Sequence, residues 1–161
     1  MTGPGAADDP VRIAVEDPTT DDAQRCLTSY FRDLDERFDT GFDPDLSNPA
    51  HVHELREPAG LLLVARVDGR AVGCGALKLH GERPVELKRM WVAPDARGLG
   101  VGRRLLGALE DAARARGARV ARLETNRSLV EAIAMYRSSG YREVEPFNDE
   151  PYAHHWFEKD L

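Results

Sequence analysis

Apolar and polar residues alternate along several short stretches of the chain, and this period of two predicts β-strands. The stretches are residues 11–15, 61–67, 70–79, 85–93, 118–125, 141–144 and 154–157. Asp68-Gly69 separates the second stretch from the third and is a strong signal for a two-residue hairpin turn. Pro94 cannot donate to a sheet ladder, so the fourth stretch ends before it. The pattern therefore predicts a sheet whose middle strands are antiparallel.

Between these strands, apolar residues recur every three to four positions, which predicts amphipathic helices. The first helix follows residues 18–22, where a capping residue precedes acids in the first turn. The second follows a glycine-rich segment near residue 100 and ends at Gly117, a good left-handed cap. The third begins at a capping box of Ser128 and Glu131. A weaker pattern predicts a short helix from about residue 49 to 56.

The order of these elements, β-α-α-β-β-β-α-β-α-β-β, defines the fold class. The strand, helix and strand within residues 85–125 form a parallel crossover unit, whereas the hairpin strands are antiparallel. This predicts an α/β protein with a mixed central β-sheet flanked by helices. A chain of 161 residues suffices for one domain, which we expect to span residues 11–161. Residues 1–10 are acidic and rich in glycine and proline, and we expect a disordered lead-in there.

Charge and composition exclude several classes of protein. The net charge of −6 argues against non-specific nucleic-acid binding, which needs a basic surface. The longest apolar run, residues 61–65, is too short to span a bilayer. Cys26 and Cys74 have no metal-site spacing, and buried, reduced thiols are the expected state. These features favour a cytoplasmic protein without nucleic-acid or membrane partners.

The segment around Gly98, Gly100 and Gly102 predicts a phosphate site. Glycines where a helix begins leave backbone N–H groups uncovered, and the helix dipole adds partial positive charge there. No lysine follows as in a nucleotide-hydrolase loop. The dinucleotide fingerprint fails as well, because its third glycine would fall on Leu105. What remains is Arg-x-x-Gly-x-Gly, beginning at Arg97, after a strand that ends Met-Trp-Val-Ala-Pro.

This segment, together with the later Tyr136, Gly140 and Tyr141, resembles the acetyl-CoA pyrophosphate loop of the GNAT family of N-acetyltransferases. The resemblance covers roughly residues 60–161 well and the first 60 residues only by the order of elements. It implies the acyl-CoA N-acyltransferase (GNAT) fold and acetyl-CoA as cosubstrate, without a metal. The residues that it implies for binding acetyl-CoA are Met90, Trp91, Val92, Arg97, Gly98, Leu99, Gly100, Val101, Gly102 and Arg103.

Two residues are candidates for proton transfer. Glu86 lies in a mostly apolar strand, where burial would raise its pKa and suit it to act as general base. It also falls where histone acetyltransferases of the family carry a catalytic glutamate. The alternatives are that Glu86 only pairs with Lys88 or Arg89, and that Glu124 or water is the base. Tyr136 stands where much of the family carries a tyrosine able to protonate the leaving thiolate; a core role is compatible with that.

The resemblance has one departure. The family usually places an asparagine seven positions before the tyrosine, where this chain has Leu129. Asn126, three residues earlier, is a candidate substitute for contact with the cosubstrate. Members of the family often form dimers through their C-terminal strands. A homodimer is therefore possible here, and Trp156 and Phe157 would supply apolar surface for it.

The acceptor is less defined. Its pocket is expected between the loop of residues 35–45 and the loop of residues 146–151 with Tyr152. The acids of these loops favour a cationic acceptor, although such acids are commonly solvated. They are Asp35, Glu36, Asp39, Asp43, Asp45, Glu145, Asp149 and Glu150. The histidines show no metal-ligand spacing.

The sequence thus favours an acetyl-CoA-dependent N-acetyltransferase. The acetyl group would pass to a primary amine of a small molecule, peptide or protein by direct attack in a ternary complex. One alternative is a non-catalytic acyl-CoA sensor or partner module of the same fold, and a more distant one is a nucleotide-binding enzyme.

Overall fold

The computed structural model of the chain describes residues 10–46, 52–81 and 83–161. One seven-stranded sheet has the order β1-β2-β3-β4-β5-β7-β6. Only β4 and β5 are parallel, and every other neighbouring pair is antiparallel, so the predicted mixed sheet is confirmed. The strands are β1 (Val11–Val15), β2 (Gly60–Val67), β3 (Arg70–Lys78), β4 (Val85–Val92), β5 (Val120–Thr125), β6 (Arg142–Val144) and β7 (His155–Asp160). The lead-in expected at residues 1–10 falls on residues 1–9, which lie outside the described part, and the single domain of residues 11–161 stays a prediction.

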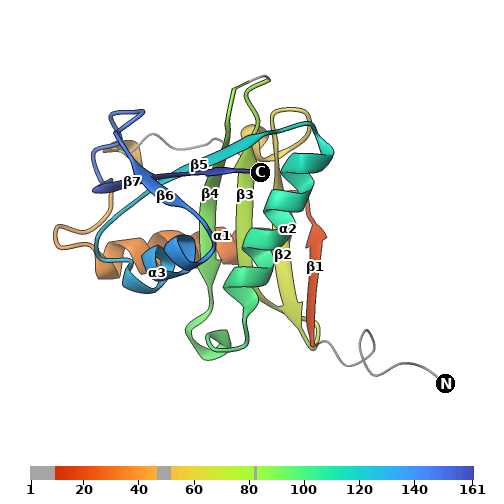
Figure 1. Cartoon of the computed structure of the whole chain (residues 1–161). Coiled ribbons are helices and arrows are strands. Elements are labelled where there is room, and N and C mark those ends of the chain that lie inside the picture. Colours follow the sequence, from red (N-terminus) through yellow and green to blue (C-terminus); the bar gives the residue numbers. More distant parts are fainter. Residues whose placement is uncertain (1–9, 47–51, 82) are drawn as a thin grey trace.

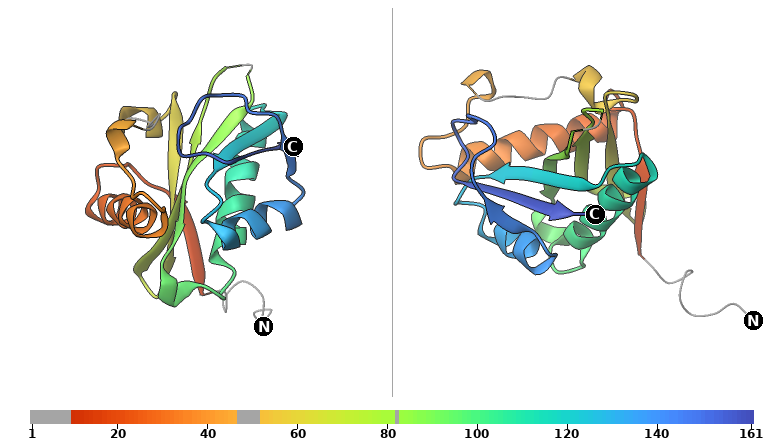
Figure 2. Two further views of the ribbon diagram at one scale, coloured as in Figure 1. Left: turned by 90° about the vertical axis from the view of Figure 1, so that its left-hand side faces the viewer. Right: turned by 45° about the horizontal axis from the view of Figure 1, so that its top comes forward.

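In the described ranges, three α-helices cover the two faces of the sheet (Figures 1 and 2). They are α1 (Asp21–Arg37), α2 (Val101–Ala115) and α3 (Val130–Ser138), with short 3-10 turns η1 (Pro44–Leu46), η2 (Val52–Leu55) and η3 (Pro94–Ala96). In the left view of Figure 2, α1 lies on one side of the sheet, and α2 and α3 lie on the other. The Thr20 hydroxyl accepts the Ala23 N–H at 3.2 Å and caps α1, as the start signature predicts.

Each face of the sheet has its own apolar core. Leu105, Leu109 and Ala113 of α2 are fully buried against the sheet, which accounts for the helical spacing of apolar residues after the glycines. On the opposite face, Ala23 and Cys26 of α1 pack against a smaller cluster that includes Val64, Cys74 and Ala76. Both cysteines are buried free thiols.

Three local predictions need correction. Ser128 does not cap α3, because the helix begins with Leu129 as its N-cap and no side chain bonds there; Glu131 instead pairs with Arg37 at 2.5 Å. The short helix predicted near residues 49–56 is the 3-10 turn η2, and residues 49–51 lie outside the described part. Phe157 has no exposed surface, so it cannot supply a dimer contact. The homodimer itself stays a prediction.

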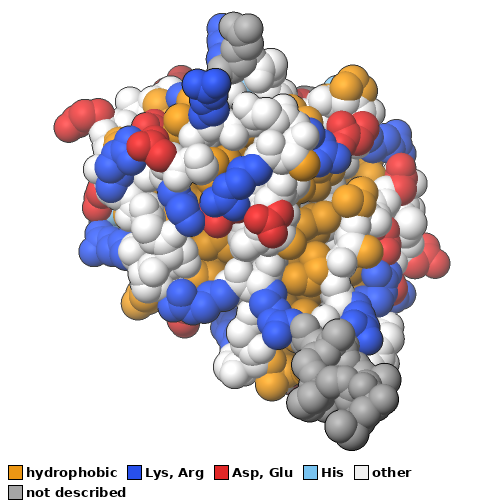
Figure 3. All heavy atoms as spheres, turned by 45° about the vertical axis from the view of Figure 1, so that its right-hand side comes forward, with side chains coloured by type: hydrophobic (Ala, Val, Ile, Leu, Met, Phe, Trp, Pro, Cys, Tyr) orange, Lys and Arg blue, Asp and Glu red, His pale blue; other side chains and the backbone are white. Residues whose placement is uncertain are grey.

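The outer surface mixes charges of both signs. On the face in Figure 3, lysine and arginine side chains are interspersed with acidic ones around exposed apolar atoms. No helix in the described ranges is long and apolar enough to cross a membrane.

The sheet splits between β4 and β5. Their parallel pairing is limited to Val85 with Ala121 and Glu86 with Arg122, after which β5 runs away from β4 (Figure 1). A bulge follows at once in β4, where Arg89 has a φ of +58° and two residues oppose Gly75 of β3. A Cβ on Gly75 would lie 2.6 Å from the Met90 sulfur and 2.8 Å from Leu109 Cδ1, so glycine lets both side chains pack closely over the bulge. The bulge and the short pairing open a cleft in the middle of the sheet.

Candidate functional site

A groove of about 640 Å³ lies where the split meets the start of α2. The end of β4 forms one wall, the glycine-rich segment and α2 form the base, and α3 and α1 complete it. The sequence-predicted residues that line it are Met90, Trp91, Val92, Arg97, Gly98, Gly100, Val101, Gly102 and Arg103. Leu99 belongs to the same loop but is half exposed, and its side chain does not line the groove.

The glycine-rich loop has the backbone of an anion site. Gly98 and Gly100 have φ values of +91° and +77°, which an L side chain rarely adopts. Gly100 is the N-cap of α2, and its carbonyl accepts the N–H of Arg104 at 3.1 Å as the first bond of the helix. The N–H groups of Val101, Gly102 and Arg103 precede that bond and have no intrahelical acceptor. These N–H groups therefore form the positive end of the helix dipole, where a phosphate would be stabilised.

The charged side chains of the groove come from three helices and the loop. Arg97 lies 3.8 Å from Asp33, and Arg37 binds Glu131 of α3 at 2.5 Å. Arg103 donates to the Ser138 hydroxyl at 2.7 Å, which ties the start of α2 to the end of α3. The groove thus has cations beside the loop, each held by a partner within the chain.

A second, smaller space of about 110 Å³ continues from the groove into the split. Five residues line both spaces, so the two adjoin: Tyr30, Leu34, Met90, Leu129 and Ala132. We call the smaller space the aromatic pocket, because rings form much of its wall: Tyr30, Phe31, Phe38, Phe42, Tyr136 and Tyr152. The loop of residues 35–45 and Tyr152 do form its wall, as the sequence predicts.

Two loops distant in sequence meet at the wall of the aromatic pocket. The Tyr152 ring packs on Phe42 at 4.8 Å and on Phe38 at 5.6 Å between centroids. Its hydroxyl accepts the N–H of Asp43 at 2.9 Å, and its carbonyl accepts the Asn126 side chain at 2.8 Å. The wall is therefore held from both sides.

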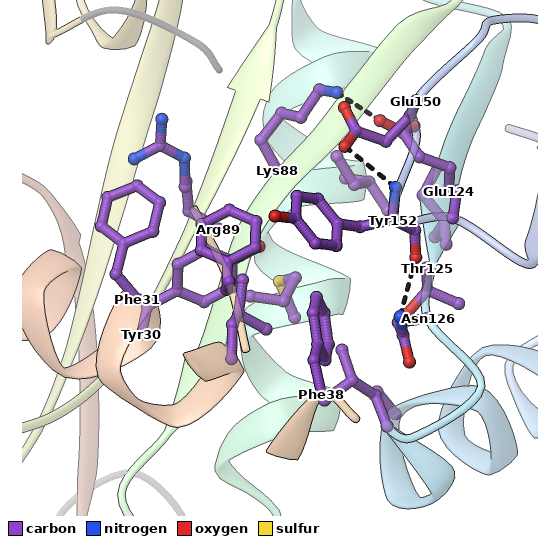
Figure 4. Close-up of a pocket in the computed structure, with 18 of the residues that line it drawn as sticks. Tyr30, Phe31, Phe38, Lys88, Arg89, Glu124, Thr125, Asn126, Glu150 and Tyr152 are labelled. Atoms are coloured by element: carbon purple, nitrogen blue, oxygen red, sulfur yellow. Dashed lines mark hydrogen bonds and ion pairs between the residues drawn. The ribbon is translucent and has the colours of Figure 1, made fainter. Parts of the chain in front are cut away.

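Charged side chains lie at one side of the aromatic pocket, with Lys88, Glu124 and Glu150 close together in Figure 4. Lys88 Nζ is 2.7 Å from Glu124 Oε1 and 3.4 Å from Glu86 Oε2. Burial lowers the pKa of Lys88, but the two carboxylates outweigh it and the net direction is upward, so Lys88 is a cation. The other Glu124 oxygen, Oε2, is buried and has no hydrogen-bond partner among the described residues.

Glu86 contacts Lys88 but lines neither the groove nor the aromatic pocket. It is 3.3 Å from His80 and 3.5 Å from Arg122, in addition to Lys88. Burial raises the pKa of Glu86, but Lys88, His80 and Arg122 together outweigh it and the net pKa is lowered. The predicted upward shift is therefore wrong, and the alternative that Glu86 pairs with Lys88 is confirmed.

Tyr136 of α3 lines the aromatic pocket and is 5% exposed. Its ring packs edge-on against Tyr141 at 5.8 Å, so its core role is confirmed. Burial raises the pKa of its phenol above the ordinary value, with smaller contributions from Tyr30 and Glu124. The phenol is thus a neutral donor at physiological pH.

Asn126 stays a predicted contact of the cosubstrate, and the structure shows what it binds within the chain. It lines the aromatic pocket, not the groove, and both ends of its amide are used within the chain. Nδ2 donates to the Tyr152 carbonyl, and Oδ1 accepts the Ser128 N–H at 2.8 Å. Asn126 therefore holds the loop that carries Tyr152 against the end of β5.

Sequence reasoning missed several residues of the aromatic pocket. Lys88 and Arg89 were considered only as partners of Glu86. The bulge at Arg89 has no sequence signal other than Gly75 on the opposite strand. Arg89 stacks on Phe31 at 4.6 Å. Of the loop acids, only Glu150 lines the pocket. Asp39 instead faces Arg127 at 3.4 Å, and Asp35 caps the N–H of Phe42.

No group of three or more histidine, cysteine or acidic residues in the described ranges could hold a metal ion.

Comparison with known proteins identifies the family. The model of the acetyltransferase (GNAT) family matches residues 23–141. An "IAA acetyltransferase" of Azospirillum brasilense is 37% identical over 144 residues, which cover 89% of this chain and 90% of that protein. A GNAT acetyltransferase of Staphylococcus aureus has the same fold, with a TM-score of 0.78 and 18% identity over 94% of this chain and 99% of that one. A GNAT acetyltransferase of Elizabethkingia anophelis with acetyl-CoA bound has a TM-score of 0.66 and 16% identity over 95% and 99% of the two chains. Because the family match spans more than half of its length, this chain belongs to the acetyltransferase (GNAT) family.

Proposed function

We propose that the chain transfers an acetyl group from acetyl-CoA to a primary amine, with both substrates bound at once in the split between β4 and β5. The observation that carries the proposal is the continuity of the two spaces. The glycine-rich start of α2 lines the groove, Glu124 lines the aromatic pocket, and five residues line both. Thioester and amine can therefore meet without a covalent enzyme intermediate.

The donor lies in the groove. The pyrophosphate of acetyl-CoA is held by the N–H groups of Val101, Gly102 and Arg103, with Arg97 nearby. The β4 backbone at Met90, Trp91 and Val92 is unpaired on the β5 side, because the parallel ladder stops at Glu86. The pantetheine arm pairs with that edge like an added strand, and a backbone N–H there stabilises the developing oxyanion.

Proton transfer involves Glu124 and Tyr136. An ammonium must lose a proton before it attacks the thioester, and the buried Glu124 Oε2 supplies an acceptor in the pocket. Tyr136 protonates the departing thiolate, since its raised pKa keeps the phenol protonated. Glu86 is not retained as the base, because it lines neither space and is engaged by Lys88, His80 and Arg122.

The test combines binding with turnover. CoA, ATP and NAD are added separately in a thermal-shift assay, and only CoA is expected to raise the melting temperature, because a ligand that binds the native state stabilises it. Release of free thiol from acetyl-CoA is then followed with a panel of amines, and turnover with at least one is expected. Binding of CoA without thiol release from any amine would make the chain a binding module.

A further inference from the structure

The size of the aromatic pocket limits what can enter it. Its volume of about 110 Å³ is of the same order as a cavity of about 150 Å³ that holds one benzene molecule in another protein. Besides Tyr152, three phenylalanines from α1 and the segment after it line this space: Phe31, Phe38 and Phe42. Phe31 and Phe42 stack with centroids 5.7 Å apart and an interplanar angle of 13°. The space therefore suits an apolar group of about one ring.

The same wall disfavours the entry of a polypeptide chain into the aromatic pocket. Tyr152 bridges two segments that are far apart in sequence, through its hydroxyl to Asp43 and its ring to Phe42. The Asn126 side chain also donates to the Tyr152 carbonyl and holds the backbone of Tyr152 in place. A peptide chain that entered between the two segments would have to break these contacts, whereas a compact molecule would not.

The carboxylate of Glu124 in the aromatic pocket can accept a further hydrogen bond. Glu124 Oε2 is buried without a hydrogen-bond partner in the described part of the chain, and a buried carboxylate oxygen in that state is costly. Oε1 already binds Lys88, so the Glu124 carboxylate stays in place. The N–H groups of an amine satisfy Oε2, and aromatic faces attract an ammonium as well.

We infer that the acceptor is a compact primary amine with an apolar body of about one ring, and that Tyr152 is the residue that selects it. The inference rests on the proposed acetyl transfer and names its acceptor class. The amine lies at Glu124, and the apolar body packs against the wall that the Phe42 and Tyr152 rings form.

The experiment measures kcat/KM for thiol release with three amines: 2-phenylethylamine, ethanolamine and a hexapeptide of alanine and glycine with a free N-terminus. For the unaltered protein, we expect 2-phenylethylamine to exceed both others by at least about 10-fold, since buried apolar groups give discrimination of that order. Tyr152→Ala should remove most of this preference and leave CoA affinity unchanged. Tyr152→Phe keeps the ring and should keep the preference.

Phe147→Ala is the matched control. Phe147 lies in the same loop but packs on Arg122 at 4.3 Å and does not line the pocket, so the preference should remain. Equal use of the hexapeptide or of ethanolamine by the unaltered protein would overturn the inference while leaving acetyl transfer intact. An unchanged preference in Tyr152→Ala would overturn the role of Tyr152. Absence of thiol release with every amine would refute the proposed function and, with it, this inference.

Discussion

The groove and the aromatic pocket adjoin, but they are built in different ways. Much of the groove comes from one continuous stretch, the end of β4 and the first turn of α2, within residues 90–103. The aromatic pocket is assembled from α1 and the segment after it, β4, β5, α3 and the loop that carries Tyr152. A site made from local backbone geometry suits a constant ligand such as pyrophosphate. A site made from several loops, such as the aromatic pocket, can vary in shape without disturbing the groove.

From this difference we expect changes at the glycines to weaken cosubstrate binding and to leave the aromatic pocket intact. A side chain at Gly100 would be strained at a φ of +77°, and a Cβ at Gly102 would lie 3.1 Å from the Met135 sulfur. Valine at either position should weaken CoA binding by about 100-fold, the cost of two hydrogen bonds to a charged group. Isothermal titration with CoA measures this loss.

Gly107→Ala is the control for the glycine variants. It lies in the same helix, and its Cβ would meet nothing within 4 Å, so CoA affinity should be unchanged. If both valine variants bind CoA as tightly as the parent, the loop does not hold the pyrophosphate.

Tyr136→Phe tests the chemistry where the two spaces meet. The ring that packs on Tyr141 remains and only the hydroxyl is lost, so the free energy of unfolding should change by about 1 kcal/mol. We expect kcat to fall by about 100-fold while CoA affinity is nearly kept. Since the pKa of Tyr136 is raised, the parent's rate should show no alkaline decline from this group up to about pH 10, the ordinary value for a tyrosine.

Tyr141→Phe is the matched variant. The Tyr141 hydroxyl donates to Glu110 at 2.8 Å outside both spaces, so its loss should reduce stability and leave kcat within about 2-fold. Equal kcat values for Tyr136→Phe and the parent would assign Tyr136 to the core alone.

Glu86 should affect stability in acid more than it affects catalysis. Its pKa in the folded chain lies below the ordinary 4.5, so the unfolded chain binds more protons. The resulting stability is present above about pH 4.5 and is lost as pH falls through the folded pKa. Urea unfolding from pH 6 to pH 3 should therefore show a smaller loss for Glu86→Gln than for the parent. The exposed Glu145→Gln should behave like the parent, and parallel curves for Glu86→Gln and the parent would contradict this reasoning.

The same contrast explains what could be predicted from the sequence. Alternation, the Asp68-Gly69 turn and the glycine-rich helix start are local signals, and they predicted where the strands lie along the chain and the segment that lines the groove. Glu86 was misjudged because its pKa is lowered by Lys88 on the same strand, by His80 in the loop after β3 and by Arg122 of β5. Asn126 was assigned to the cosubstrate, but its partner Tyr152 is 26 residues away and has no signal near Asn126.

The central claim is that chemistry takes place where groove and pocket adjoin, with Glu124 as the base. The most direct test is the pH–rate profile of Glu124→Gln beside that of Glu86→Gln, with saturating acetyl-CoA. We expect Glu124→Gln to lose about 100-fold near pH 7 and to recover as the amine deprotonates by itself at high pH. Glu86→Gln should keep the shape of the parent's profile. A Glu124→Gln profile parallel to the parent's at every pH would show that Glu124 is not the base.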